Sequence, residues 1–191
     1  MKLILITPPT CFVEEDKIIT ALFEEGLDLL HLRKPDIAPM YAERLLTLIP
    51  EQYHKRIVVH ENFYLKDEYM LKGIHLNSRN PHIPDNYKGH ISHSCHTLEE
   101  VKECKKGCDY VFLSPVFDSI SKQSYHSNYT PEEIKKAYKA GIIDKKVIAL
   151  GGIDTDNIRQ VKNYGFGGAA ILGALWNKFD TCTDRDYTQL I

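Results

Sequence analysis

Two short apolar runs near the end of this chain stop at glycine, and each is followed by a helical pattern. They are Val147–Leu150, followed by Gly151 and Gly152, and Gly168–Leu172, followed by Gly173. Glycine lets a ligand approach the backbone closely, and the N–H groups at the start of a helix favour an anion. We therefore predict that these three glycines offer backbone contacts to the phosphate of a small molecule.

Arg33 is a candidate for a charged ligand in the first half of the chain. The run Leu27–Arg33 predicts a strand, and alternation along it places His31 and Arg33 on the same, inward side. An arginine cannot shed its charge, so an inward position requires an anion beside it. That anion is either a ligand phosphate or a protein carboxylate such as Glu61 in a structural ion pair.

The longest irregular stretch, Val116–Asn128, is polar and rich in serine and tyrosine. Within it, Ser119, Ser121 and Lys122 offer two hydroxyl groups and an ammonium group, a set that can wrap a phosphate or a pyrophosphate. Because the stretch follows a predicted strand, we expect it to lie over the site as a lid. An exposed polar loop is the alternative interpretation.

Glu61 directly follows the strand-like run Arg56–His60. A carboxylate there can bind a hard cation such as Mg²⁺, which takes one or two carboxylates together with phosphate oxygens. It can equally begin a helix, where a negative charge suits the helix dipole. The residues alone leave both interpretations open.

For the other histidines and cysteines, the sequence favours structural roles over catalytic or metal-binding ones. His75 lies in the body of a predicted strand, where we expect a core residue. His96, beside Ser94 at a predicted helix start, is a capping candidate. Cys104 and Cys108 lie four residues apart on one helix face, which is half of a zinc site. The chain lacks a partner Cys-x-x-Cys, so a packing face is favoured.

Strand-like and helical patterns that must position these residues alternate along the whole chain. The predicted strands are Lys2–Thr7, Leu27–Arg33, Arg56–His60, Gly73–Leu76, His90–Ser94, Asp109–Ser114, Val147–Leu150 and Gly168–Leu172. The predicted helices are Glu14–Glu25, Pro39–Leu48, Tyr64–Leu71, Leu98–Lys106, Pro131–Ala140 and Thr155–Asn163, two of them with threonine before their first turn. Between them, Asn77–Lys88 holds two prolines and little periodicity, so we predict a fourth helix reduced to a turn.

This alternation predicts an α/β protein that forms a single, compact TIM (β/α)8 barrel. The two glycine-ended units also resemble the phosphate site after strands 7 and 8 of such barrels. An open doubly wound sheet is the rival, but it places a glycine-rich loop after its first strand, where this chain has Pro8-Pro9-Thr10-Cys11.

Length and composition limit the number of domains, the kinds of partner and the cellular compartment that we expect. The 191 residues, 43% of them hydrophobic, fit one domain over residues 1–191, with a core at about 2–176 and a C-terminal tail at 177–191. A net charge of −2 gives no reason to expect a nucleic-acid or membrane partner. The apolar start is too short for a signal peptide, and five scattered cysteines suit a reducing cytoplasm.

Six motifs in register carry a family resemblance. They are Leu30–Arg33, Gly73–Leu76, Ser94–Glu99, Asp109–Val111, Ser114–Phe117 with Ser121 and Lys122, and Val147–Ile153. Together they resemble the thiamine phosphate synthase and thiazole tautomerase superfamily over roughly residues 2–176. The resemblance implies a TIM barrel that joins hydroxymethylpyrimidine pyrophosphate to thiazole phosphate. It also implies that Mg²⁺ and basic groups stabilise the departing pyrophosphate.

The chain departs from the synthase pattern in several places. After the second strand that pattern is Gln-x-Arg-x-Lys, and here His31 and Pro35 replace the first and last residues, with Lys34 expected to point elsewhere. The Asn-Asp pair after the third strand becomes His60-Glu61. The second magnesium aspartate aligns with Asn80, which removes one charged ligand.

The tautomerase branch shares the His-x-Arg form after the second strand. It places a proton-transferring histidine where this chain has Pro115, which can neither accept nor donate a proton. Two alternatives to the synthase therefore stand: a metal-free isomerase using His31, His60 or His96 as base, and a weakly catalytic protein that binds thiazole or thiamine phosphate.

The resemblance and the residues together give one set of expected roles. Arg33 and Lys122 are the expected catalytic pyrophosphate ligands, and Glu61 and Asn80 are the expected Mg²⁺ ligands. The expected substrate-binding residues are His31, His60, Ser94, His96, Ser119, Ser121, Gly151, Gly152 and Gly173. The expected partners are phosphorylated pyrimidine and thiazole molecules, with a homodimer as a possible assembly.

Overall fold

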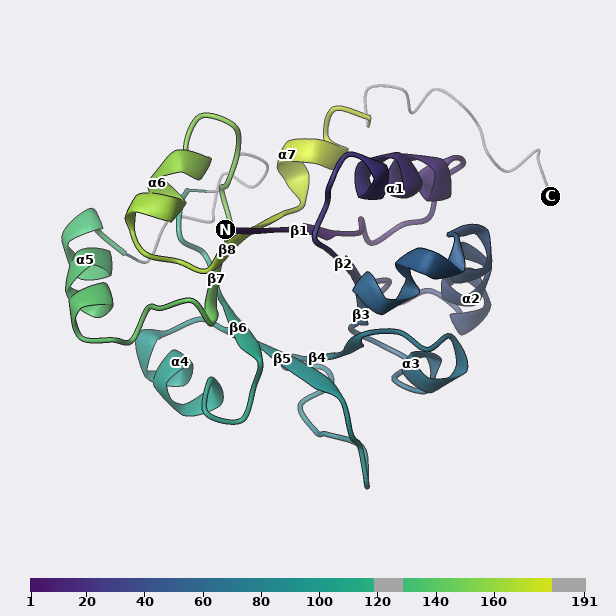
Figure 1. The fold of residues 1–191 in the computed structure, drawn as a ribbon, viewed down its shortest axis with the longest axis horizontal. Helices are drawn as coiled ribbons and strands as arrows, with labels where there is room; N and C mark the ends of the chain where they lie inside the picture. Colours follow the sequence, from purple (N-terminus) through teal and green to yellow (C-terminus); the bar gives the residue numbers. More distant parts are fainter. Residues whose placement is uncertain (119–128, 180–191) are drawn as a thin grey trace.

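The structure, a computed structural model, describes residues 1–118 and 129–179. Eight parallel strands close into a barrel in the order β1 to β8, and β8 returns to pair with β1. Figure 1 shows the helices arranged around the outside of these strands. The predicted TIM barrel is confirmed.

The elements follow the predicted order. The strands are β1 (Lys2–Ile6), β2 (Leu29–Leu32), β3 (Ile57–Val59), β4 (Gly73–Leu76), β5 (His90–Cys95), β6 (Tyr110–Leu113), β7 (Val147–Leu150) and β8 (Gly168–Ile171). The helices are α1 (Glu15–Glu24), α2 (Pro39–Leu48), α3 (Leu65–Glu68), α4 (Leu98–Cys104), α5 (Pro131–Lys139), α6 (Ile158–Asn163) and α7 (Gly173–Trp176). A 3-10 helix, η1 (Glu51–Arg56), was not predicted. Cys108 lies beyond the end of α4, so its prediction on one helix face with Cys104 is wrong.

The connection between β4 and β5 contains no helix, as its prolines predicted. All of residues 77–89 are described, and they form turns instead. The first turn closes through mutual backbone hydrogen bonds between Asn77 and Asn80. Figure 1 shows the segment projecting from the barrel between α3 and α4. One side of the barrel therefore lacks a covering helix.

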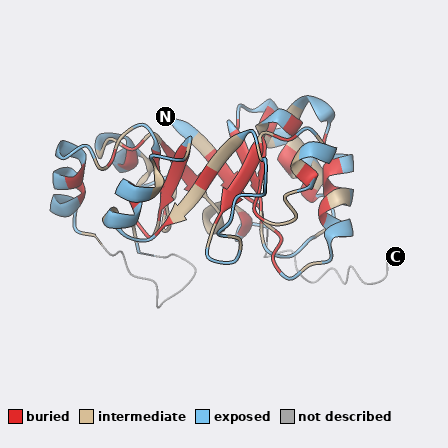
Figure 2. Cartoon of the chain, turned by 90° about the horizontal axis from the view of Figure 1, so that it is seen from below, coloured by how far each residue is buried: buried red, intermediate tan, exposed pale blue. Residues whose placement is uncertain are grey.

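Apolar side chains form one core inside the barrel and two between the strands and the helices. The interior core consists of Ile4, Ile6, Leu29, Tyr110, Phe112, Ile148 and Ala170. Leu30 and Leu32 pack in an outer core with α1 and α2 residues such as Ile19 and Leu46. Figure 2 shows the buried strands at the centre of the molecule and the more exposed helices around them. Alternation along β2 therefore sends every second side chain inward, as predicted.

Two helix starts match their sequence signals. Thr97 caps α4 by accepting a hydrogen bond from the Glu100 N–H at 3.1 Å. Thr130 and Glu133 form a reciprocal capping box at the start of α5. Thr97, not His96, is therefore the capping residue of α4, and the capping interpretation of His96 is wrong.

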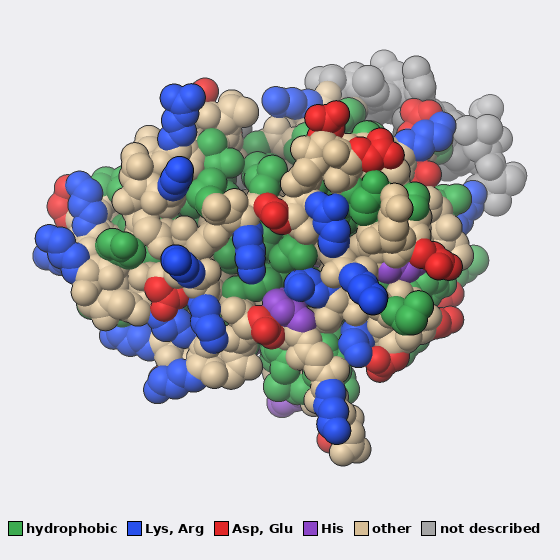
Figure 3. All heavy atoms as spheres, in the orientation of Figure 1, with side chains coloured by type: hydrophobic (Ala, Val, Ile, Leu, Met, Phe, Trp, Pro, Cys, Tyr) green, Lys and Arg blue, Asp and Glu red, His purple; other side chains and the backbone are tan. Residues whose placement is uncertain are grey.

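Charged side chains of both signs are mixed on the face shown in Figure 3. This mixing agrees with the small net charge of −2. Among the described residues, none of the helices combines the length and the apolar character that crossing a bilayer requires.

Candidate active site

The carboxyl ends of parallel barrel strands meet at one rim, and the predicted site residues lie on these ends or on the loops after them. Arg33 follows β2, His60 and Glu61 follow β3, and Asn80 lies in the turn after β4. Ser94 lies on β5 near its end. The barrel therefore gathers the predicted residues from the first five strands at one rim.

Thr7 holds the backbone at Arg33. Its buried hydroxyl oxygen accepts a hydrogen bond from the Arg33 N–H at 2.9 Å, and the hydroxyl donates to the Arg33 carbonyl oxygen at 2.9 Å. Among the described residues, no ion pair joins the Arg33 guanidinium to a carboxylate. The predicted structural ion pair with Glu61 is absent there, which favours a ligand anion as the partner of Arg33.

Lys34 points away from Arg33, as expected. Its ammonium nitrogen lies 2.7 and 2.8 Å from the two carboxylate oxygens of Glu15, and both side chains are 2% exposed. The same nitrogen donates to the carbonyl oxygens of Pro8 at 2.9 Å and Thr10 at 2.8 Å. The Lys34 ammonium group therefore binds only the loop between β1 and α1 and the first residue of α1. It does not take the place of the lysine that the synthase pattern has at the position of Pro35.

Glu61 is bound to the backbone of the β2 loop. Its Oε2 accepts the Lys34 N–H at 3.0 Å. Burial raises the pKa of the Glu61 carboxyl, while that hydrogen bond and the nearby Arg33 and Arg79 guanidinium groups oppose the rise. α3 begins only at Leu65, so the interpretation of Glu61 as a helix-starting residue is wrong.

Three buried histidines fill the barrel beneath this rim. His31 Nδ1 lies 2.8 Å from His60 Nε2, and His31 Nε2 is hydrogen-bonded to the Tyr110 hydroxyl. His75 is held by Ser92 and Ser94, whose hydroxyl oxygens each lie 2.8 Å from one of its ring nitrogens. His60 stacks on His75 with 4.1 Å between ring centroids. The prediction that His75 is a core residue is confirmed.

Burial keeps these imidazoles neutral. Desolvation lowers the pKa of His31 and His60 well below the usual value, and lowers that of His75 to about 3. Burial likewise lowers the pKa of His90, at the start of β5, to about 4. The interior of the barrel therefore contains polar rings without charge.

We expect acid to destabilise the fold through these neutral rings. An unfolded histidine takes up a proton near pH 6.5, whereas His75 and His90 in the fold resist protonation down to about pH 3 and 4. Their contribution to stability is therefore complete above about pH 6.5 and is lost progressively as the pH falls toward those values. Urea unfolding at several pH values measures this. His90→Gln should flatten the dependence and His82→Gln, in an exposed loop, should not; equal slopes for both would contradict the explanation.

Asn80 and His96 have defined partners at the rim. The Asn80 side-chain amide donates to the His60 carbonyl oxygen at 2.9 Å, which leaves its own Oδ1 as a potential ligand atom. His96 is exposed, and its Nδ1 lies 3.0 Å from the Ser114 carbonyl oxygen, which links the ends of β5 and β6. Both residues are therefore oriented by backbone carbonyls of neighbouring strand ends.

Gly151 and Gly152 have a packing role that sequence reasoning missed. Both have positive φ, 94° and 64°. A Cβ on Gly151 would meet Pro115 at 2.9 Å, and a Cβ on Gly152 would meet the Asp118 carbonyl oxygen at 2.2 Å. The loop after β6 thus packs directly on the end of β7. Their predicted contact with a phosphate, like that of Gly173, remains a prediction.

Gly152→Ala is expected to destabilise the fold by roughly 2–4 kcal/mol, because it combines left-handed backbone strain with overpacking. Gly107→Ala is the matched control, since nothing lies within 4 Å of its Cβ position. Chemical denaturation of both variants measures the difference. Equal stability of the two variants would contradict the close approach at Gly152.

Ser119, Ser121 and Lys122 lie outside the described residues, so the predicted lid and its phosphate contacts stay predictions.

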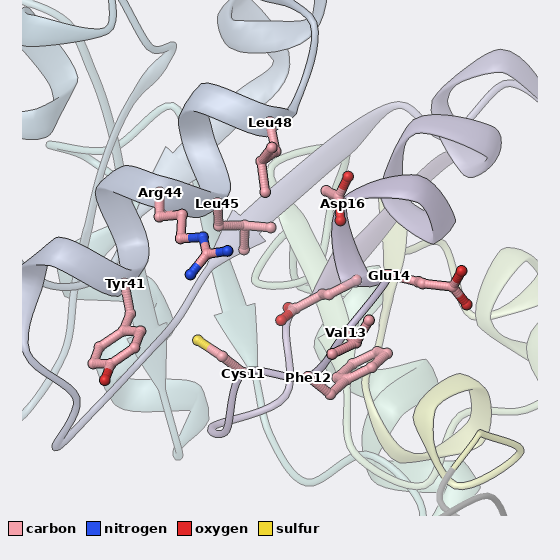
Figure 4. Close-up of a pocket in the computed structure, with 10 residues that line it drawn as sticks. Cys11, Phe12, Val13, Glu14, Asp16, Tyr41, Arg44, Leu45 and Leu48 are labelled. Atoms are coloured by element: carbon pink, nitrogen blue, oxygen red, sulfur yellow. The ribbon is translucent and has the colours of Figure 1, made fainter. Parts of the chain in front are cut away.

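Outside the barrel, a cavity of about 270 Å³ is lined by the segment before α1, with Cys11 and Phe12, and by Tyr41 and Arg44 of α2. Figure 4 shows these side chains. Of the predicted site residues that the structure describes, none lines this cavity, so it is not the site at the rim.

The structure adds residues to the rim that the sequence did not single out. The charge of Arg79 lowers the pKa of Glu61 and that of Asp36 raises it. A guanidinium nitrogen of Arg79 lies 3.9 Å from a carboxylate oxygen of Asp36. Their loops follow β4 and β2, the two strands that pair with β3, so the only available signal was the adjacency of these strands to the one before Glu61. Tyr110 of β6 joins the histidines; it stands in the Asp109–Val111 motif, but its bond to His31 was not predicted.

Comparisons with known proteins identify the family of this chain. A family model described as thiamine monophosphate synthase matches residues 3–175. The thiamine-phosphate synthase of Actinobacillus succinogenes is 26% identical over 136 residues, which cover 68% of this chain and 61% of that protein. The one from Dictyoglomus turgidum is 26% identical over 157 residues, covering 78% of this chain and 70% of that protein. The chain thus spans under two thirds of the first of these relatives.

Solved structures give the same relationship. A thiamine phosphate pyrophosphorylase from Bacteroides thetaiotaomicron is 63% identical, with a TM-score of 0.88 over 98% of this chain and 91% of that one. One from Pyrococcus furiosus is 22% identical, with a TM-score of 0.72 over 91% of this chain and 86% of that one, which shows the shared fold.

Proposed function

Because the chain belongs to the thiamine monophosphate synthase family, we propose that it joins hydroxymethylpyrimidine pyrophosphate to thiazole phosphate and releases pyrophosphate. The observation that carries the proposal is Arg33. Its backbone is fixed by Thr7, and among the described residues its guanidinium has no carboxylate in an ion pair. A charge held in this way at the rim needs an anionic ligand.

In this proposal, most of the catalysis comes from stabilising the negative charge of the leaving pyrophosphate. As the bond between the pyrimidine methylene and the pyrophosphate breaks, negative charge grows on the phosphate oxygens, and Arg33 and Lys122 neutralise it. Ser119 and Ser121 donate hydrogen bonds to the same group. The thiazole nitrogen then attacks the pyrimidine cation, while backbone N–H groups at Gly151, Gly152 and Gly173 hold the thiazole phosphate.

The donor set at the rim fits Mg²⁺. Glu61 offers one carboxylate, oriented by the Lys34 N–H, and Asn80 offers an amide oxygen oriented through its bond to His60. Mg²⁺ needs only one or two such ligands when phosphate oxygens and water complete its shell. When bound, it would neutralise charge on the pyrophosphate.

In this mechanism the histidines orient neighbouring side chains or contact the substrates, and they do not transfer protons. Both ring nitrogens of His31 are bound, to His60 and to Tyr110, so His31 has no free nitrogen to serve as a base. It instead orients His60, which together with Ser94 and His96 is proposed to contact the substrates. This arrangement argues against a metal-free isomerase that uses His31.

An assay of pyrophosphate release by the purified protein tests the proposal. Release that requires the pyrimidine pyrophosphate, the thiazole phosphate and Mg²⁺ together would support the synthase. Isomerisation of a thiazole phosphate without metal would favour the isomerase. Binding of thiamine phosphate without turnover would favour the weakly catalytic binding protein. The phosphorylated substrates and scattered cysteines favour action in the cytoplasm, and the homodimer remains a prediction.

Glu61→Gln is expected to raise the Mg²⁺ concentration needed for half-maximal release about tenfold or more, because it removes the one charged ligand proposed. Glu24→Gln, on the exposed end of α1, should leave this concentration unchanged. Titration of Mg²⁺ in the release assay measures both. An unchanged requirement in Glu61→Gln would assign the metal to other groups.

A further inference from the structure

Sulfur and imidazole groups gather on the outer face of β5, on the other side of the sheet from the proposed active site. Ser92 and Ser94 point inward, where they hold His75. Alternation therefore sends His93 and Cys95 outward, toward α4. Cys95 is fully buried in the outer core, and Cys104, at the end of α4, packs against that core.

The donor atoms of His93, Cys95 and Cys104 all lie within 4.8 Å of one another. His93 Nδ1 is 3.9 Å from Cys95 Sγ. In a tetrahedral zinc site, with bonds of about 2.3 Å to sulfur and 2.0–2.1 Å to nitrogen, donor atoms lie roughly 3.5–3.8 Å apart. A shift of about 1 Å at the end of α4 would therefore bring these three donors into bonding geometry.

Cys108 supplies a fourth candidate donor. It lies in the turn after α4, and its side chain packs against the same core as Cys104. The core that both side chains contact also contains the buried Cys95, so Cys108 is the thiol placed to complete the group. Three thiols and one imidazole make up one of the common donor sets of structural zinc sites.

We propose that His93, Cys95 and Cys104, with Cys108 as the fourth donor, bind a zinc-type divalent cation on the outer face of the barrel. Each thiol that binds loses its proton to solvent as the metal–sulfur bond forms, and nothing is oxidised or reduced. The donors are soft, unlike the oxygen ligands of Glu61 and Asn80, so the two sites select different metals.

The bound ion would tie β5 to α4 and to the turn that follows α4. With four protein donors the site would be closed, which is typical of a structural rather than a catalytic metal. β5 also carries, on its inner face, the two serines that hold His75. The ion would therefore support the wall of the barrel behind the proposed active site, whatever reaction the rim performs.

Burial affects two of these four side chains, the thiols of Cys95 and Cys108. Burial raises the pKa of the Cys95 thiol, and raises that of Cys108 to about 11, so both are protonated at neutral pH.

Titration of the full chain with Co²⁺ under reducing conditions tests the proposal. We expect one equivalent to produce thiolate-to-cobalt charge-transfer absorption and the visible bands of tetrahedral cobalt, and Zn²⁺ to displace it. Cys104→Ser and His93→Gln should weaken binding at least tenfold. The double variant Cys11→Ser, Cys182→Ser removes the two thiols outside the cluster and should bind as the unmodified chain does.

Two results would overturn the site: no charge-transfer absorption in the unmodified chain, or full absorption in Cys104→Ser. Full affinity in Cys108→Ser would overturn the assignment of the fourth donor. Thermal unfolding adds a readout independent of spectroscopy, since Zn²⁺ should raise the melting temperature of the unmodified chain and not that of Cys104→Ser. Cys95→Ser is not needed, because its burial makes loss of folding a competing explanation.

Discussion

Replacing Arg33 with alanine is expected to lower kcat/KM for pyrophosphate release by about 10²–10³-fold, the usual effect of removing one group that stabilises charge in a transition state. The fold should survive, because Thr7 bonds to the backbone of Arg33 and not to its side chain. The loss should appear mainly in kcat, since charge on the leaving pyrophosphate grows as its bond breaks.

Two further variants make this result specific. Arg33→Lys keeps the charge but loses the planar fork that can bind two phosphate oxygens, so it should restore activity only in part. Arg44→Ala removes an exposed arginine of α2 outside the barrel and should have no effect. Steady-state kinetics and a melting curve of each variant are the measurements. Full activity in Arg33→Ala would remove Arg33 from the mechanism.

Lys34→Met is expected to lower the free energy of unfolding by about 3–5 kcal/mol, because it leaves the buried Glu15 carboxylate without its cation. Both side chains are 2% exposed, so water cannot replace the lost partner. The carbonyl oxygens of Pro8 and Thr10 lose their donor as well. Urea unfolding at neutral pH measures the change.

The double variant Lys34→Met, Glu15→Leu separates a broken pair from lost packing. Removing both charges should recover much of the stability, since apolar residues of similar volume often replace a buried ion pair without loss. Lys17→Met disrupts the exposed pair with Glu14 and should change little. A double variant as unstable as Lys34→Met would show that the charge on Glu15 is not the cause.

The order of elements could be predicted from the sequence because it rests on local signals. Period-two alternation identified β2, and Thr130 before Pro131 marked the start of α5, which the capping box confirms. The prolines of residues 77–88 correctly excluded a helix. Closure into a barrel followed from the count of strands and their alternation with helices.

The contacts within the candidate site could not be predicted, because they join residues far apart in the chain. Nothing near Lys34 signals that Glu15 binds it, and nothing near His31 signals Tyr110. The same limit applied to the cysteines: a packing face was favoured for Cys104, because the donor atoms of His93 and Cys95 near it come from another element. The packing role of Gly152 was missed because the loop that packs on it follows a different strand.

The pairing of β1 with β8 has a consequence for biosynthesis. Ile4 lies beside Ala170, so β1, the first strand of the barrel to be synthesised, gains its second neighbour only when β8 emerges from the ribosome. Until then the growing sheet has two open edges, which are templates for pairing with other chains. The barrel therefore stays open to pairing with other chains until β8 has been translated.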